Sequence, residues 1–465
     1  MTKLPECIQR AERARLFPIL AETSKEGRTL SIFLATLSSV RELNTRFLGE
    51  VGQRVGATAK VRSFTEIEFK CAPGETNLGR PDGLIILDIG TRRWTALVEA
   101  KVGRSEITSE QLERYLTLAK QNKIDAVITI SNQFSAVPRH HPVRVNMSKF
   151  KGVELFHFPW MHVLTEADLL TINRDVQDDD QAYILNEFLR FISHESAGVQ
   201  GFTQMPDAWP NLLTTIKAGG PLNKSADVGR VAEAWQQEAR DLCLVLSRQL
   251  KSLVSERLSR AALSSSEVRF QSDVESITRD QILSVTYDIP GAAALLEVKL
   301  DLRGRSVLVS MRVRAPEDRV YNSAKLNWLL RQLPEAPNDD LHIRCHWPKT
   351  SAPTQFKLSD LRVQPRKMED GKGKMTVIAF EVIMASDLGR RFDQRRNFVD
   401  ELERVVPEFY IEVGQHLKAW QAPPPKVVQA RDEASKVTPA AISENAEATS
   451  DEWPTTGAID QTRTD

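Results

Sequence analysis

Two short apolar runs constrain the fold of this chain more than any other feature. Residues 83–88 read GLIILD and residues 125–131 read DAVITIS, so neither run alternates between apolar and polar positions. A run of this length without alternation is typical of a strand whose two faces are both covered, as in the middle of a sheet that carries helices on both sides. The chain is therefore predicted to contain a helix-covered sheet with these two segments near its centre.

The segments around these runs predict the rest of an α/β layer. Residues 64–70 (FTEIEFK) alternate between apolar and charged side chains, as a half-buried strand does, and residues 94–101 are predicted as another strand. Apolar residues recur every three or four positions through residues 28–53, which predicts one amphipathic helix. The remaining predicted elements are a strand over 153–158 and helices over 108–121 and 160–172. The order of helix, three strands, helix and strand predicts a mixed sheet flanked by helices.

The length of 465 residues suggests two or three domains. We assign residues 1–175 to the α/β domain, 176–262 to a helical connector, 263–421 to a C-terminal α+β accessory domain, and 422–465 to a disordered tail rich in Pro, Ser, Thr and Ala. The connector includes a long helix over 226–260. Its apolar seam predicts either packing against its own chain or a dimerising coiled coil.

The composition excludes several classes of protein. The chain has 62 basic and 62 acidic side chains, and this balance argues against coating nucleic acid or membranes through bulk positive charge. The four cysteines are far apart and form no CxxC pair, so neither a disulfide scaffold nor a cysteine-held metal cluster is expected. No apolar stretch approaches the ~20 residues that span a membrane, and the start lacks the apolar core of a secretory signal. A soluble, cytoplasmic protein without a membrane partner is therefore expected.

Three charged residues on two predicted strands carry the chemistry. Asp82 opens the strand 83–88, and Glu99 and Lys101 lie two positions apart on the next strand, so their side chains leave the same face. A short turn joins the strands, which would bring Asp82 close to Glu99. Two carboxylates at the end of an apolar sheet are costly to bury unless a cation neutralises them, and Mg²⁺ or Mn²⁺ prefers such oxygen ligands. With Lys101 to stabilise charge on a hydroxide or a phosphate, these residues indicate phosphodiester hydrolysis.

These residues resemble the motif of the PD-(D/E)XK nuclease superfamily, which has the restriction-endonuclease-like fold. Pro81-Asp82 followed by Glu99-Ala100-Lys101 matches both halves of the motif, and Gln111 and Tyr115 match the QxxxY element of its RecB-like and lambda-exonuclease-type branches. The resemblance covers about residues 28–172. It implies that Asp82 and Glu99 bind the metal ion, that Lys101 helps to activate the attacking water, and that Gln111 and Tyr115 lie beside the active site.

The family pattern usually includes one more acidic residue, on the first helix or the first strand. Glu66 and Glu68 lie on the strand 64–70 and share a face, so either could complete the metal site. Glu42 and Glu50 on the predicted first helix are the rivals. We select Glu66 as the third metal ligand, with Glu68 as its closest alternative.

The second unit repeats part of the motif in Glu297-Val298-Lys299, but no Pro-Asp strand precedes it, so we interpret this copy as ordinary strand alternation. Residues 301–400 carry 19 basic and 13 acidic side chains. The basic residues surround Tyr321 and Trp328, which predicts either a surface that holds phosphates and stacks a base or a solvated face around a core tryptophan.

The expected function is that of a Mg²⁺-dependent nuclease that hydrolyses phosphodiester bonds, in DNA rather than RNA, in bacterial defence or DNA repair. The alternative is a catalytically silent nuclease-fold scaffold or a nucleic-acid-binding adaptor. The sequence contains no GxxxxGK[ST] loop, so any ATP-driven step would need a separate ATPase or helicase partner, and a homodimer is a further candidate assembly. The choice between endonuclease and exonuclease stays open at this level.

Overall fold

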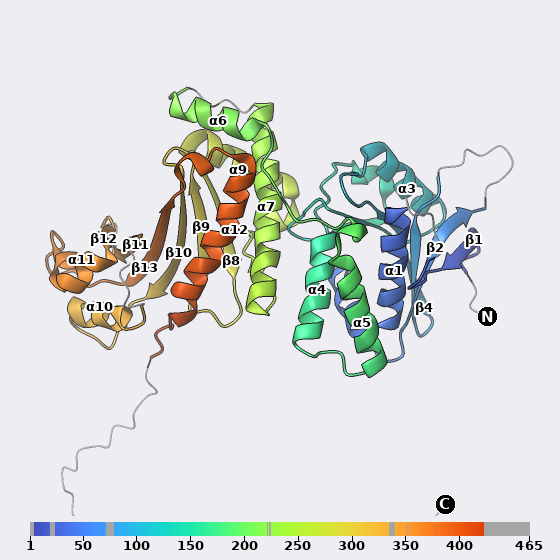
Figure 1. Ribbon diagram of the computed structural model, residues 1–465, viewed down its shortest axis with the longest axis horizontal. Coiled ribbons are helices and arrows are strands. Elements are labelled where there is room, and N and C mark those ends of the chain that lie inside the picture. The colour runs from blue at the N-terminus through green and yellow to red at the C-terminus, as the bar shows by residue number, and fades with distance from the viewer. Residues whose placement is uncertain are drawn as a thin grey trace, which may run out of the picture. The chain divides into compact units, whose positions relative to one another are not determined.

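The computed structural model describes residues 4–18, 24–70, 79–220, 222, 225–333, 340–349 and 351–422. Residues Met1–Trp420 form one compact unit. It is an α/β structure with a mixed six-stranded sheet and a seven-stranded antiparallel sheet, both flanked by helices (Figure 1). The tail that we predict to be disordered lies outside the described residues beyond Ala422.

The first sheet contains six strands in the order in which they follow along the chain. The strands are β1 (Ile8–Arg13), β2 (Lys60–Phe69), β3 (Gly83–Ile89), β4 (Arg92–Ala100), β5 (Ala126–Ser131) and β6 (Glu154–Pro159). β1 to β4 pair in antiparallel fashion, whereas β4, β5 and β6 are parallel to one another. The mixed sheet predicted from the order of elements is therefore present, with β1 as an additional strand that the sequence pattern did not indicate.

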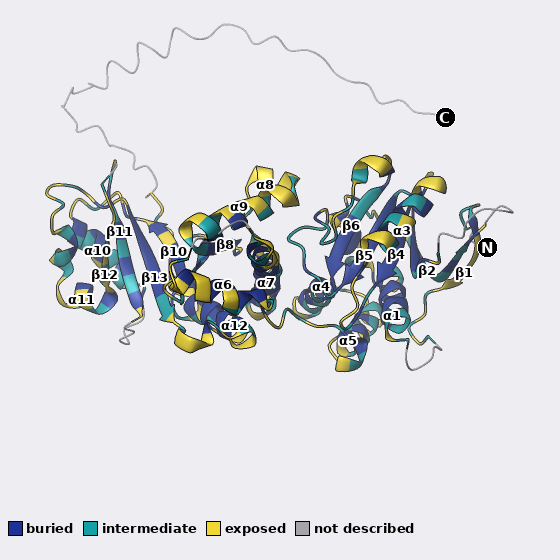
Figure 2. Cartoon of the chain, turned by 90° about the horizontal axis from the view of Figure 1, so that it is seen from above, coloured by how far each residue is buried: buried dark blue, intermediate teal, exposed yellow. Residues whose placement is uncertain are grey.

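Both faces of this sheet are covered, as the apolar runs predict. Ile85 and Leu87 of β3 belong to one hydrophobic core, while Leu84 and Ile86 belong to a second core on the opposite face. The first core includes residues of α1 (Lys25–Ser39), α2 (Arg41–Glu50), α4 (Trp160–Ile172) and α5 (Asp179–Ile192), and the second includes residues of α3 (Ser109–Gln121). Two short 3-10 helices, η1 (Met147–Phe150) and η2 (Glu195–Ala197), complete this part of the chain. Figure 2 shows its central strands buried between helices.

The single helix predicted over 28–53 is two helices, α1 and α2. They meet at Val40, whose extended backbone (φ −101°, ψ 111°) interrupts the helical hydrogen bonds. The apolar spacing continues across this break because residues on both helices face the same core. Periodicity alone therefore did not reveal the interruption. It matters for the site, because α1 contacts β2, β3 and β4, whereas α2 packs against α1 and α4.

The second sheet is antiparallel throughout, with the strand order β12-β11-β13-β10-β9-β8-β7. Its strands are β7 (Ser255–Glu256), β8 (Ile282–Asp288), β9 (Leu296–Asp301), β10 (Ser306–Arg314), β11 (Leu341–His346), β12 (Thr354–Lys357) and β13 (Ala379–Asp387). The helices of this part are α6 (Ala208–Lys217), α7 (Ala226–Leu250), α8 (Arg260–Ser264), α9 (Ser266–Asp280), α10 (Asn322–Leu330), α11 (Leu358–Val363), η3 (Pro365–Glu369), η4 (Gly389–Arg391), α12 (Arg395–Glu412) and η5 (Gly414–His416).

The segment that we predict to be a connector divides between the two cores. α5 packs in the core of the first sheet, while α6 and α7 pack in the core of the second. α7 ends at Leu250 rather than near residue 260, because Lys251 adopts a left-handed conformation (φ 53°) that closes the helix. The apolar seam of α7, which includes Trp235 and Leu242, is buried within its own chain. The first of the two interpretations of this helix therefore holds in the structure.

Among the described helices, none combines the length and the apolar composition that a membrane span requires.

Candidate active site

The register of β3 and β4 brings Asp82 and Glu99 together. Gly83 pairs with Val98, so the next position along the hairpin places Asp82 opposite Glu99. On the other side of β3, Gly83 pairs with Thr65, which places Glu66 of β2 next to Asp82. Glu66 within β2, Asp82 just before β3 and Glu99 near the end of β4 are thus neighbours across the sheet.

A close helix contact fixes the backbone at this end of β3. A Cβ atom on Gly83 would lie 2.7 Å from Cδ1 of Leu34 on α1 and 3.3 Å from Cβ of Val98. The first contact is shorter than real Cβ atoms make and the second is tight, so a side chain at this position would displace Leu34. The glycine after Asp82 therefore allows α1 to pack directly on the strands that carry the acidic residues.

Glu99 is the most deeply buried acid of the group, with 2% of its side chain exposed. Its Oε1 accepts hydrogen bonds from Nζ of Lys101 at 2.8 Å and from Nε2 of Gln111. Its Oε2 is buried and has no hydrogen-bond partner among the described residues. A buried carboxylate oxygen without a partner is expensive, so this atom is available to a cation.

Asp82 accepts a hydrogen bond from the backbone N–H of Ala100 at 3.1 Å, which ties it to β4. Burial raises the pKa of Asp82 to about 8, and the negative charge of Glu99 adds to the increase. The charged form of Asp82 is therefore unfavourable at this position, first because it is removed from water and second because Glu99 lies beside it.

Lys101 lies between two carboxylates. Its Nζ is 2.8 Å from Glu99 and 3.3 Å from Oε2 of Glu26 in the first turn of α1. Burial by itself would lower the pKa of Lys101, but the hydrogen bond and charge of Glu99 outweigh it and raise the pKa above its usual value. The backbone of Lys101 is also held on both sides, since its N–H donates to Ile130 and its carbonyl accepts from the buried indole of Trp160.

Helix α3 directs Gln111 and Tyr115 toward the acidic residues. The side chain of Thr108 caps the helix by accepting the N–H of Gln111, which sets where the helix begins and so which face it presents. Gln111 then donates to Glu99, and the hydroxyl of Tyr115 donates to the carbonyl of Arg80 at 3.4 Å. Burial, followed by the charge of Glu99, raises the pKa of Tyr115 to about 12, so it remains a hydrogen-bond donor.

Glu66 and Glu68 both form ion pairs with Arg80, two residues before Asp82. The guanidinium of Arg80 lies 2.9 Å from Glu66 and 3.2 Å from Glu68. Glu66 lies at a bulge, where β2 has one more residue than β1 between two paired positions, and its backbone is left-handed (φ 56°). Its position next to Asp82 keeps Glu66 within reach of the site, while its carboxylate is bound to Arg80.

The two rival residues on the predicted first helix lie on α2, which packs against α1 and α4. Glu50 instead accepts a hydrogen bond from Nε2 of His162 at 2.7 Å, and Glu166 completes a cluster whose ligand atoms lie within 4.8 Å of one another. Both nitrogens of His162 are in use, because Nδ1 accepts from Arg240 at 3.1 Å. Glu166 is likewise paired with Arg46. In the structure, all three members of this cluster are therefore engaged by hydrogen bonds or ion pairs with the protein.

The sequence pattern missed two residues that the structure adds to the site, Glu26 and Arg80. Glu26 precedes the first residue of the predicted helix by two positions, so the periodicity gave no reason to consider it. Arg80 stands within the Gly-Arg-Pro-Asp segment, where the family motif assigns a role to the aspartate and not to the arginine. An acidic residue in the first turn of a helix that packs over the strands is the signal that would have identified Glu26.

The donor set suits a hard divalent cation. Asp82 and Glu99 offer only oxygen atoms, and the Oε2 of Glu99, which has no hydrogen-bond partner among the described residues, would accept such an ion. Bound there, a cation would also relieve the repulsion that raises the pKa of Asp82. Glu66 is ion-paired with Arg80, and the three carboxylates, all among the described residues, do not bring ligand atoms within 4.8 Å of one another. Asp82 and Glu99 are therefore the residues of this group that could hold Mg²⁺ or Mn²⁺.

Comparison with known proteins identifies no relative of this chain. No protein-family model matches the chain, and neither the characterised proteins nor the solved structures contain a match. The case for a function therefore depends on the geometry around Asp82, Glu99 and Lys101.

Proposed function

We propose that the chain is a metal-dependent nuclease of the PD-(D/E)XK type with a restriction-endonuclease-like first domain, and that its substrate is DNA. The observation that carries the proposal is the pairing of the half-buried Asp82 with the buried Glu99 across adjacent strands, with a carboxylate oxygen of Glu99 that lacks a hydrogen-bond partner among the described residues and a lysine beside it. Buried like charges are retained where they hold a cation or do chemistry, because they destabilise the fold otherwise.

Asp82 and Glu99 would hold Mg²⁺ or Mn²⁺, with Glu66 as the third candidate ligand. A divalent ion in this position supplies Lewis-acid stabilisation of a phosphate and lowers the pKa of water. Glu66 would have to leave Arg80 in order to bind, which links the third ligand to the segment that precedes Asp82.

The side chains around the carboxylates have separate tasks. Lys101 is held as a cation by Glu99 and Glu26, so it would stabilise negative charge on the attacking oxygen or on the phosphate. Gln111 fixes the orientation of Glu99. Tyr115 fixes the backbone at Arg80, two residues before Asp82. Both are positioning residues in this scheme.

The choice of DNA and of a setting in bacterial defence or DNA repair comes from the family resemblance. In the second part of the chain, the basic surface predicted around Tyr321 and Trp328 is partly neutralised. Arg314 pairs with Glu317, Arg305 pairs with Asp393, and Lys325 is buried with its ammonium group donating to Val377. The catalytic proposal therefore rests on the first sheet alone.

The test is a cleavage assay on the purified full-length chain. Single- and double-stranded DNA and RNA would each be incubated with Mg²⁺, with Mn²⁺ or with a chelator. The variant Asp82→Ala removes a proposed metal ligand, and Asp180→Ala removes an exposed carboxylate of α5 as a matched control. We expect metal-dependent cleavage of DNA that Asp82→Ala abolishes and Asp180→Ala retains.

Cleavage that survives the Asp82→Ala substitution would show that the activity arises elsewhere. Absence of cleavage on every substrate, in a sample that is folded by circular dichroism, would favour the silent scaffold or nucleic-acid-binding adaptor. Preferential cleavage of RNA would keep the site and change the substrate.

A further inference from the structure

A cavity of about 100 Å³ opens beside Asp82. Its wall includes Arg13, at the end of β1, and Arg15, two residues further along the chain. The other lining residues come from β1, β2, the segment before α1 and α1 itself: Glu12, Pro18, Gly27, Ser31, Thr65 and Glu66. The cavity thus joins the N-terminal strand, which the sequence pattern did not reveal, to the proposed catalytic residues.

Among the charged side chains around this cavity, two acids have ion-pair partners, whereas the two arginines that line it do not within the described residues. Glu12 is 3.1 Å from Arg10, and Glu66 is 2.9 Å from Arg80, so both acids already have cationic partners. Within the part of the chain that the structure describes, neither Arg13 nor Arg15 has a side-chain hydrogen bond or ion pair, and both are exposed. The unpaired charges of the cavity are therefore two guanidinium groups and the carboxylate of Asp82.

The backbone that carries these arginines is held firmly. The N–H of Ala14 donates to the carbonyl of Ser63 on β2 at 3.1 Å. The buried hydroxyl of Ser31 on α1 accepts the N–H of Arg15 at 2.9 Å and donates to its carbonyl at 3.1 Å. Gly27, in the first turn of α1, also lines the cavity, and the N-terminal end of a helix favours an anion.

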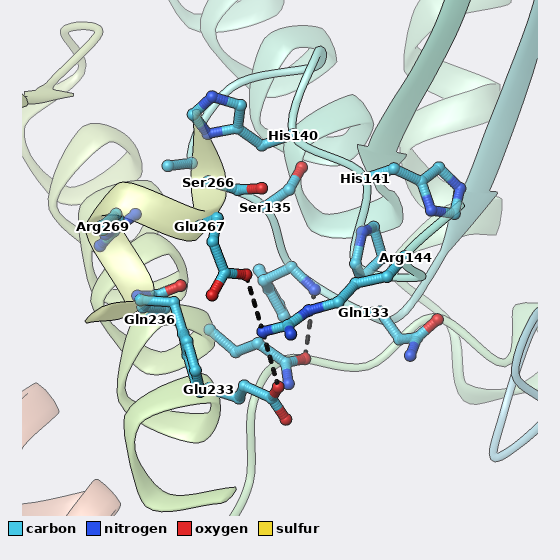
Figure 3. Close-up of a pocket in the computed structure, with 15 residues that line it drawn as sticks. Gln133, Ser135, His140, His141, Arg144, Glu233, Gln236, Ser266, Glu267 and Arg269 are labelled. Atoms are coloured by element: carbon cyan, nitrogen blue, oxygen red, sulfur yellow. Dashed lines mark hydrogen bonds and ion pairs between the residues drawn. The ribbon is translucent and has the colours of Figure 1, made fainter. Parts of the chain in front are cut away.

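In contrast to Arg13 and Arg15, Arg144 is ion-paired within a larger cavity of the same chain. It has a volume of about 160 Å³ and is lined by residues that follow β5 and by residues of α7 and α9 (Figure 3). There the guanidinium of Arg144 lies 3.3 Å from Glu267 and 3.8 Å from Glu233, and it stacks over Phe270 at 4.8 Å. Because two glutamates already neutralise the charge of Arg144, this arginine is not free to bind an anionic ligand in the cavity.

We propose that Arg13 and Arg15 form a phosphate-binding subsite that holds a backbone phosphate of a nucleic-acid strand next to the phosphate positioned at Asp82 and Glu99. This inference rests on the proposed function and extends it to a substrate contact. Guanidinium groups match phosphate oxygens because their planar forks donate two parallel hydrogen bonds. The contact reads the backbone and not the bases, so it provides affinity and register without sequence preference.

The test measures binding of a fluorescein-labelled single-stranded DNA of 20 nucleotides by anisotropy, with Ca²⁺ in place of Mg²⁺ to limit cleavage, over a range of KCl concentrations. The variants are Arg13→Ala/Arg15→Ala, each single substitution, and Arg13→Lys/Arg15→Lys. Arg54→Ala is the matched control, since Arg54 is exposed and follows Gln53, which hydrogen-bonds Arg92 at the opposite end of β4 from Glu99.

We expect the double alanine variant to bind at least about 10-fold more weakly at low salt, and the slope of log Kd against log salt to decrease by roughly 1.4 for two lost contacts with single strands. The double lysine variant should recover the salt slope but only part of the affinity, because lysine cannot form the bidentate contact. In the cleavage assay with Mg²⁺, the double alanine variant should raise KM while kcat stays within about 3-fold of wild type. Thermal melting and circular dichroism show whether each variant is folded.

An unchanged affinity and salt slope in the folded double alanine variant, with wild type binding and cleaving DNA, would overturn the subsite and leave the proposed function intact. If wild type binds DNA through these arginines but cleaves no substrate, the subsite stands and the catalytic proposal fails. If wild type binds neither DNA nor RNA, both proposals fail. An equal loss in Arg54→Ala would assign the effect to net charge and also reject the subsite.

Discussion

The same three-residue pattern occurs in both sheets with different consequences. Lys101 lies 2.8 Å from Glu99 on β4, and Lys299 lies 2.9 Å from Glu297 on β9, so the two ion pairs have almost the same length. In the first pair 2% of the glutamate side chain is exposed, and in the second 36%. Neighbours differ too, because Glu99 faces Asp82 across the hairpin, whereas Glu297 pairs with Ser310 and Thr286.

The difference comes from the layers around each strand. β4 is buried on both faces from Trp94 to Ala100, so a glutamate there is removed from water and must find partners. β9 alternates between buried and half-buried residues, so Glu297 and Lys299 lie on its more accessible face. A Glu-x-Lys pattern thus becomes chemically unusual only where both faces of its strand are covered.

The sharpest way to test this comparison is to neutralise each glutamate in turn. Glu99→Gln keeps the shape of the side chain but removes the charge that would bind the metal ion, so we expect metal-dependent cleavage to fall by at least about 100-fold. Glu297→Gln should stay within about 2-fold of wild type. Initial rates with Mg²⁺ on labelled DNA measure both, and equal losses in the two variants would remove the distinction between the two sites.

The pH dependence of stability gives a second contrast. In the folded, metal-free protein the pKa of Asp82 is raised to about 8 by burial and by the charge of Glu99, whereas an aspartate in the unfolded chain titrates near 4. Between these values the folded state holds a proton that the unfolded chain has lost, so this group lowers the free energy of unfolding as pH rises from about 4 to about 8. Asp82→Asn should remove that decline and stabilise the metal-free protein at pH 8 by roughly 1–2 kcal/mol.

Thermal melting in a chelator at several pH values from 5 to 9 measures this effect. Glu297→Gln should follow the wild-type profile, and added Mg²⁺ should raise the melting temperature of wild type more than that of Asp82→Asn. A wild-type contribution from Asp82 that increases with pH over this range would contradict the assignment.

A smaller effect is expected from the hydrogen bond that orients Glu99. Gln111 donates a hydrogen bond to Glu99, so Gln111→Ala should weaken Mn²⁺ binding by about 10-fold through loss of orientation. Gln121→Ala, an exposed glutamine at the end of the same helix, is the control. Calorimetric titration with Mn²⁺ measures both, and equal affinity in the two variants would show that Gln111 has no positioning role.

The smallest effect is expected at the second pair itself. Because Glu297 and Lys299 are more than a third exposed, a double-substitution cycle with Glu297→Gln and Lys299→Met should give a coupling free energy below about 1 kcal/mol in urea unfolding. A coupling of several kcal/mol would mean that the second pair is structural in its own right and would require a new account of β9.

Local sequence patterns were sufficient to predict the strands that carry the candidate site. The uninterrupted run in β3 and the short turn after it determined two-sided burial and a hairpin, and the hairpin placed Asp82 opposite Glu99. The spacing of Gln111 and Tyr115 placed them on one face of α3. These features depend on residues close together in the chain, where periodicity of two or about 3.6 residues records which face is buried.

Only the tertiary structure could decide four other features. These are the break at Val40, the added strand β1, the pairing of Arg80 with Glu66 and Glu68, and the contact of Glu26 with Lys101. Each joins segments whose relative position is set by how α1 and β1 pack against β2 to β4, and an exposed arginine or glutamate leaves no periodic signal of such a contact. By itself, then, the sequence determined the central strands of the sheet and the pairing of Asp82 with Glu99, because local alternation and turn length encode them. Packing of distant segments decided which charges meet that pair and which arginines remain free beside it.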